Sequence, residues 1–193
     1  MEKIACPEVI VHYYEASKGP FQSLSDLRLE DAEAILQKIR HEGTVFASKR
    51  NHEYLTIRKS LEDKIYQMFV EKGGRPKRLR PHYFILGHCD WVKTWYCHGR
   101  EVEILLNTVN PKVISFTYGD SFPAMRYLDG RPYRGQVYTF EELAELVTQY
   151  GLPQVWNSDG KDGPERYIEA QVWDDQPVKE YLCKQELHME SQR

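Results

Sequence analysis

The segment 167–173 (YIEAQVW) combines a carboxylate, an amide and two aromatic rings at alternate positions. Successive side chains of a β-strand point to opposite faces, so the three aliphatic residues of this segment would pack into a core. Glu169 and Gln171 would then share the other face with the two aromatic residues. Such a face can hold a sugar or a ring and stabilise a developing positive charge, which makes Glu169 a candidate catalytic residue. The alternative is an exposed sheet face on which Glu169 is simply solvated.

A second candidate, His12, lies in the segment 9–14 (VIVHYY), whose β-branched and aromatic residues predict a strand. The alternation places Tyr14 on the same face as His12. A histidine in an apolar strand is often a buried side chain with satisfied hydrogen bonds, and that interpretation stays open beside a role in catalysis.

Motifs near the two ends of the chain follow a characteristic order. A strand of the form apolar-His-Tyr (11–13) precedes a helix of the form Ala-x-x-Ile-Leu (32–36), and Gly43 then precedes an Ala-Ser pair. Towards the other end, the segment 164–172 (PERYIEAQV) precedes Pro177. This order resembles the ADP-ribosyltransferase-like proteins, among which the DNA-modifying toxins and the RNA 2′-phosphotransferases are most similar in style.

The resemblance implies an enzyme that consumes NAD and transfers ADP-ribose to a macromolecular acceptor, nucleic acid included. It implies that His12 contacts the NAD ribose near the nicotinamide, and that Glu169 orients the ribose and supports an oxocarbenium-like transition state. An aromatic ring would stack on the nicotinamide. The residues that it offers for NAD binding are Tyr14, Ser48, Tyr83 and Tyr118. Tyr167 stands where arginine- and DNA-targeting relatives often keep Gln or Glu, so the acceptor preference does not carry over.

Basic residues are concentrated in one part of the chain. The formal net charge is −3, but residues 38–80 carry twelve basic and five acidic side chains. A segment of this density can attract phosphates, and its candidate nucleic-acid-binding residues are Arg75, Lys77, Arg78 and Arg80. The alternative function is therefore a non-catalytic nucleotide- or nucleic-acid-binding protein of bacterial or phage type that uses the 38–80 segment. A solvated helix face, or an interaction module without a small ligand, also fits this pattern.

Two further clusters have residue types that suit binding. His88, Cys89, Cys97 and His98 are zinc-ligand types, but adjacent residues rarely bind one ion, so no metal site is expected. The loop 118–134 could line a cleft, with Arg126, Arg131 and Arg134 holding phosphate beside Tyr118 and Asp120. Ordinary half-buried loop packing explains the same residues.

The spacing of apolar residues predicts one α+β domain over residues 1–183, with a split, mostly antiparallel sheet and about three helices. The resemblance implies that this fold is ADP-ribosyltransferase-like. The last residues, 184–193, are expected to form a flexible tail. The expected strands are 9–14, 44–48, 82–86, 101–106, 113–118, 135–138 and 167–173. The main helices are expected to end at Gly43, at Gly73 and at Gly151, and a capping box at 139–142 (TFEE) precedes the last of them.

The apolar runs and the cysteines indicate the compartment. No apolar run approaches the ~20 residues of a membrane-spanning helix, and the first residues lack the apolar stretch of a secretory signal. Four scattered cysteines in 193 residues are too few for a disulfide scaffold. We therefore expect a cytoplasmic protein without a membrane partner, and the sequence leaves its oligomeric state open.

Overall fold

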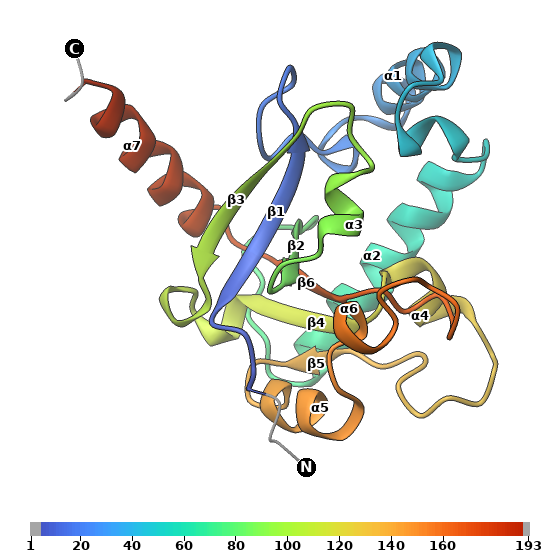
Figure 1. Cartoon of the computed structure of the whole chain (residues 1–193), viewed down its shortest axis with the longest axis vertical. Coiled ribbons are helices and arrows are strands. Elements are labelled where there is room, and N and C mark those ends of the chain that lie inside the picture. Colours follow the sequence, from blue (N-terminus) through green and yellow to red (C-terminus); the bar gives the residue numbers. More distant parts are fainter. Residues whose placement is uncertain (1–4, 191–193) are drawn as a thin grey trace.

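The computed structural model describes residues 5–190 and contains six strands and seven α-helices in this part of the chain. Figure 1 shows their arrangement. The strands are β1 (Val9–Glu15), β2 (His82–Leu86), β3 (Gly99–Leu105), β4 (Ile114–Tyr118), β5 (Tyr138–Thr139) and β6 (Ile168–Val172). The helices are α1 (Leu29–Glu42), α2 (Tyr54–Glu71), α3 (Asp90–Lys93), α4 (Ser121–Arg126), α5 (Leu143–Tyr150), α6 (Pro153–Trp156) and α7 (Gln176–Glu190).

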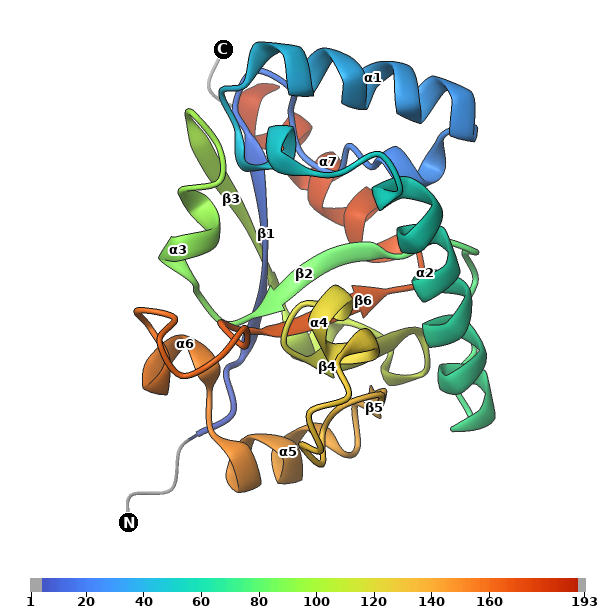
Figure 2. The ribbon, with the colours of Figure 1, turned by 90° about the vertical axis from the view of Figure 1, so that its right-hand side faces the viewer.

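The strands form one open antiparallel sheet in the order β3-β1-β2-β6-β4-β5. The expected α+β class and antiparallel pairing are confirmed, whereas the expected division of the sheet is not, because hydrogen bonds run continuously across it. Strand β1 pairs with β2 at only two positions, Ile10 with Leu86 and Val11 with Ile85. Beyond these positions β1 runs steeply across β2 and β6 (Figure 2), and the opening between them becomes part of the candidate site.

The two faces of the sheet differ in composition. On one face the aliphatic side chains of β6 pack with those of β2 and β4 and with α5, in a core that excludes water. The opposite face of β6 carries Glu169 and Gln171, as the alternation of the sequence predicts. The apolar side of α2 covers part of this second face, with Ile65 and Phe69 packed against Trp173. Its polar side chains are therefore buried rather than solvated.

Several expected elements differ from the observed ones. The strand expected at 135–138 is reduced to the two residues of β5, and seven α-helices are present within the described residues where about three were expected. Residues 46–49 form a short 3₁₀ turn instead of a strand, because this segment only links α1 to α2 and bonds to the backbone of Trp95. The segment 184–190, expected as part of a tail, continues α7, which extends away from the sheet (Figure 1). The helix is anchored at its start, where Val178 is buried and Tyr181 packs against Phe21. Residues 191–193 lie outside the described part of the chain.

No helix within the described residues is both long enough and apolar enough to cross a membrane.

A buried ion pair ties together the two loops that follow β4 and precede β6. Glu165 is fully buried and accepts a hydrogen bond of 2.8 Å from Arg131. Arg134, whose side chain is 5% exposed, pairs with the same carboxylate. Asn157 donates to the backbone carbonyl of Glu165 and closes the loop 157–165. These contacts set the path of the chain as it enters β6.

Glu165→Ala is expected to lower the free energy of unfolding by about 1–3 kcal/mol, because it removes the carboxylate from one side of the buried Arg134 guanidinium, whose other side still pairs with Asp129. Glu141→Ala is the matched control, since Glu141 forms an exposed pair with Lys112 and should contribute less than about 1 kcal/mol. Urea denaturation measures both. Equal effects of the two substitutions would contradict the structural role given to Glu165.

Candidate functional site

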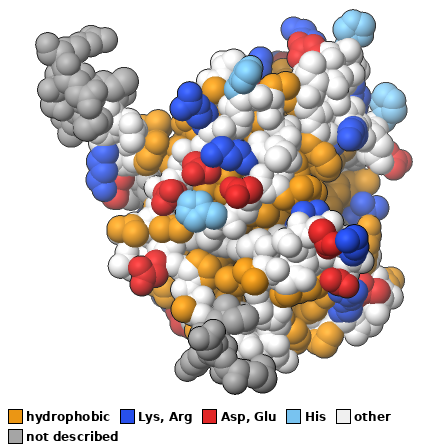
Figure 3. Space-filling model, in the orientation of Figure 1, with side chains coloured by type: hydrophobic (Ala, Val, Ile, Leu, Met, Phe, Trp, Pro, Cys, Tyr) orange, Lys and Arg blue, Asp and Glu red, His pale blue; other side chains and the backbone are white. Residues whose placement is uncertain are grey.

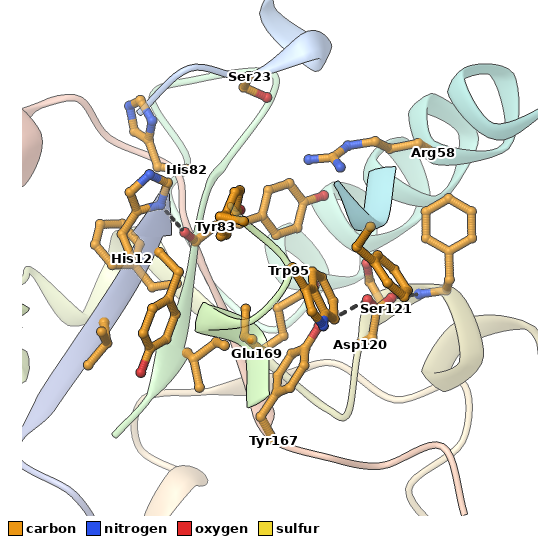
Figure 4. Close-up of a pocket in the computed structure, with 18 of the residues that line it drawn as sticks. His12, Ser23, Arg58, His82, Tyr83, Trp95, Asp120, Ser121, Tyr167 and Glu169 are labelled. Carbon is orange, nitrogen blue, oxygen red and sulfur yellow. Dashed lines mark hydrogen bonds between the residues drawn. The ribbon is translucent and has the colours of Figure 1, made fainter. Parts of the chain in front are cut away.

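A cavity of about 460 Å³ lies against the polar face of β2 and β6 and is walled by α2, α3 and α4. Its volume falls within the range of sites that hold small organic ligands. Figure 4 shows its lining, in which aromatic rings predominate over a small number of charged side chains. The polar and aromatic side chains of its floor and walls include Glu169, Asp120, Tyr167, Tyr83, Arg58, Arg50 and Trp95.

Glu169 lies on the floor of this cavity and is 7% exposed. Gln171 donates a hydrogen bond of 3.1 Å to its Oε1 atom, and Ser121 also bonds the carboxyl group. Burial raises the pKa of Glu169 to about 8, and the negative charge of Asp120 adds to this rise. A carboxyl group with so high a pKa is common at catalytic sites, where proton uptake and release must occur near neutral pH.

Asp120 places a second carboxylate beside Glu169. It is the N-cap residue of α4, and its Oδ1 atom accepts a hydrogen bond of 2.8 Å from the backbone N–H of Phe122. Its Oδ2 atom accepts a hydrogen bond of 3.0 Å from the hydroxyl of Tyr167 (Figure 4). The two bonds hold Asp120 in one orientation, so the pair of carboxyl groups is rigid before any ligand enters.

The wall opposite the carboxyl groups is aromatic and cationic. The guanidinium of Arg58 lies 4.5 Å from the ring centroid of Tyr83 and forms a buried ion pair with Glu62. Tyr83 also donates to Glu62, over 2.9 Å, which fixes its ring. Arg50 stacks on Tyr54 at 4.2 Å from the ring centroid, and no carboxylate of residues 5–185 pairs with it. Arg50 is therefore the cation of this wall that can bind an anionic ligand group.

Trp95 supplies a polar atom that lacks a partner. Its indole nitrogen is buried, yet it donates to no acceptor among the described residues. A buried donor without an acceptor is costly in free energy. A hydroxyl or carbonyl oxygen of a ligand in the cavity would supply the missing acceptor.

His12 does not approach Glu169 in the way that the resemblance implied. It belongs to the opposite face of the sheet, packs against Phe84 and only reaches the margin of the cavity. Its Nδ1 atom donates to the carbonyl of Tyr83 over 2.9 Å, and its Nε2 atom accepts the N–H of Phe21 over 3.0 Å. Burial lowers the pKa of His12 to about 4, which keeps it neutral. Because both ring nitrogens bond the backbone, His12 holds two chain segments together. No ring nitrogen is left to bind a ribose.

Of the four residues expected to bind NAD, Tyr83 alone lines the cavity. Tyr118 is fully buried in the core on the other face, where its hydroxyl donates to the carbonyl of Tyr150. Tyr14 packs at the edge of that same core. Ser48 donates to the carbonyl of Val45 within its own turn. The structure thus places these three side chains outside the cavity, each in local packing or in a backbone bond.

The basic residues that were expected to bind nucleic acid are largely neutralised. Lys77 pairs with Asp174, Arg80 with Asp63, and Arg78 with both Asp26 and Asp175. Basic and acidic side chains are also interspersed over the face shown in Figure 3. Arg75 has no ion pair with any residue from 5 to 185. Three of these four cations therefore have carboxylate partners within the protein, with which a phosphate would have to compete.

The histidines and cysteines around residue 90 do not assemble as one group. The Sγ atom of Cys89 lies 3.7 Å from the carbonyl of Arg166, and Cys97 bonds the carbonyl of Thr44. His88 instead lies near two glutamates of β3, Glu101 and Glu103. This group is largely exposed, and its Glu101 already pairs with Lys93.

Several residues of the site had no clear signal in the sequence. Asp120 was one of the polar residues noted in the 118–134 loop, but its role as the partner of Glu169 depends on the pairing of β4 with β6. Arg58 lies within a helix whose periodicity marks only its apolar side. Trp95 follows α3, and nothing in its local sequence indicates that the indole nitrogen is unpartnered. Strand alternation, by contrast, correctly placed Tyr167 and Gln171 beside Glu169.

No family model, curated protein or solved structure matches this chain.

Glu169→Gln is expected to raise the melting temperature, and to raise it more at pH 8.5 than at pH 5. The folded protein keeps a proton on Glu169 up to about pH 8, whereas the unfolded chain releases it near pH 4.5. Stability is therefore lost as the pH rises through this window, and the amide removes that loss. Calorimetry at the two pH values tests this. An equal shift at both would contradict the burial of an ionisable group at this position.

Proposed function

We propose that the protein breaks the bond between nicotinamide and ribose in NAD and transfers ADP-ribose to a macromolecular acceptor. The observation that carries the proposal is the rigid pair of carboxyl groups, Glu169 and Asp120, on the floor of an aromatic cavity. The resemblance of the two ends of the chain to ADP-ribosyltransferase-like proteins supports it, and a relationship of fold to that family is part of the proposal.

The chemistry needs negative charge beside the ribose. When the bond from C1′ to the nicotinamide nitrogen breaks, its electron pair leaves with the nicotinamide and positive charge develops on the ribose ring. Preorganised carboxylates stabilise such a charge more strongly in a dry cavity than in water. A nucleophilic atom of the acceptor then bonds to C1′ and loses its proton. Ionised Glu169 and Asp120 are suited to stabilise the charge and to accept that proton.

The other walls of the cavity fit the rest of the substrate. The ring of Tyr83, held by Glu62, offers a rigid surface on which an aromatic base can stack. Arg50 can form charge-assisted hydrogen bonds to a phosphate oxygen. The indole N–H of Trp95 can donate to a ribose hydroxyl or to the carboxamide of the nicotinamide. In this proposal His12 has a structural task, which is to join the segment at Phe21 to β2.

Purified protein is expected to release nicotinamide from NAD, and the rate should increase when DNA, RNA or protein acceptors are added. Glu169→Gln should lower kcat/KM by about 10²–10³-fold, since it removes a charge that stabilises the transition state. Glu103→Gln is the matched control, because Glu103 is half exposed on β3, outside the cavity, and should retain full activity. Liquid chromatography of the released nicotinamide provides the measurement.

An absence of nicotinamide release with every acceptor, together with an unchanged melting temperature in the presence of NAD, would contradict the proposal. The alternative nucleotide- or nucleic-acid-binding function would then be tested by binding to DNA and RNA at increasing salt. Binding through phosphate contacts falls steeply as salt rises.

The rate of nicotinamide release is expected to increase with pH and to level off above about pH 8, the pKa of Glu169. The reason is that nicotinamide leaves NAD without needing a proton, so the ionised form of Glu169 is the active one. Initial rates between pH 6 and pH 9.5 test this. A rate that falls through the same interval would show instead that the protonated acid is active.

A further inference from the structure

A row of buried polar side chains runs across β4 and β6 and ends at Glu169. The indole nitrogen of Trp173 donates to Ser115 Oγ over 2.9 Å, and the Ser115 hydroxyl donates to Gln171 Oε1 over 2.9 Å. The Nε2 atom of Gln171 then donates to Thr117 over 3.0 Å and to Glu169 over 3.1 Å. Trp173, Ser115, Thr117 and Gln171 are all fully buried. Four polar side chains in a buried location require an explanation beyond filling space.

The chemistry of the donors fixes the direction of this row. An indole nitrogen can only donate, so Ser115 must accept from Trp173 and give its single proton to Gln171. The carbonyl oxygen of the Gln171 amide is therefore engaged, and its NH₂ group must face Glu169.

A second lock acts independently of the first. The hydroxyl of Thr117 donates to the carbonyl of Gly119 over 3.0 Å, so its oxygen is left to accept from Gln171. If the amide of Gln171 turned over, the donating hydroxyl of Ser115 would face the NH₂ group and the accepting oxygen of Thr117 would face the carbonyl oxygen. Two buried hydrogen bonds would then be lost together.

We infer that Gln171 is a positioning residue, locked by Trp173, Ser115 and Thr117 so that it presents an N–H to Glu169 and thereby favours the ionised form of that carboxyl group, which is the form that the reaction uses. The inference rests on the proposed function for the identity of the reaction. The direction of the row itself rests only on the hydrogen-bond geometry.

The surroundings of Glu169 explain why such a device is needed. Burial and the charge of Asp120 both disfavour ionisation of Glu169, whereas the bonds from Gln171 and Ser121 and the charge of Arg58 favour it. The phenols of Tyr83 and Tyr167 also face the carboxyl group, and burial raises the pKa of each well above its ordinary value, so both are neutral. Gln171 thus opposes the effect of burial without adding a charge.

Two substitutions test the inference by different routes. Gln171→Met removes the donor at nearly constant volume, and Ser115→Ala leaves Gln171 in place but releases it to turn. The carboxyl carbon of Glu169 is followed by ¹³C NMR, and its signal is assigned by its absence in Glu169→Gln. In both variants the titration midpoint should move upward, by about one pH unit for Gln171→Met, the shift that corresponds to loss of one hydrogen bond to a charged group.

The pH profile of nicotinamide release should move upward with the NMR midpoint, while the rate at high pH stays within about threefold of the wild type. Ser115→Thr, a separate substitution that keeps the hydroxyl, should show the wild-type midpoint. A merely structural role would lower the rate at every pH and leave the midpoint where it was.

An unchanged NMR midpoint in folded Gln171→Met and Ser115→Ala would overturn the inference. If one variant fails to fold, the other decides. If the wild type releases no nicotinamide, the proposed function fails, but the NMR titration still shows whether Gln171 sets the ionisation of Glu169. If nicotinamide is released and the midpoints do not move, the proposed function stands and the positioning role falls.

Discussion

Burial of an ionisable carboxyl group is the constraint on which the arrangement of this molecule depends. Glu169 occupies the middle of β6, whose opposite face packs into the apolar core. Helices α2 and α4 cover the face that bears Glu169, so this carboxyl group is shielded from water. A buried carboxyl group is tolerated only with hydrogen bonds around it. Gln171 and Ser121 supply these bonds. The covering helices stop short of full closure, and the space they leave is the cavity.

The remaining contacts keep that cavity in one shape. Glu62 binds Arg58, Ser25 and Tyr83 at one wall, and the N-cap of α4 holds Asp120 at the other. The buried pairing of Glu165 with two arginines fixes the loop that follows α4 and the loop from which β6 emerges. A site that is rigid before the ligand arrives spends little free energy on reorganisation during the reaction. Burial of Glu169 lowers the stability of the folded protein, and such a loss is commonly kept where a functional site requires it.

Local patterns were enough to locate much of the fold. The alternation in 167–173 identified both the strand and the polar face that bears Glu169, although not the burial of that face under α2. The positive φ of 66° at Gly43 ends α1 where the sequence indicated. The sequence left a structural and a catalytic role for His12 open and could not decide between them, because its two partners, Phe21 and Tyr83, come from a loop and from another strand. The ion pairs of residues 38–80 could not be derived locally for the same reason, since one carboxylate that pairs with Arg78 lies 97 residues away. Pairings between distant segments are what a local pattern does not contain.

A crystal structure of the Glu169→Gln protein with uncleaved NAD tests the central claim most directly. The account predicts that the ribose attached to nicotinamide lies against position 169 and Asp120, with the nicotinamide ring on the aromatic wall and a phosphate at Arg50. NAD bound elsewhere on the molecule, or bound in the cavity with its ribose remote from both carboxyl positions, would contradict it.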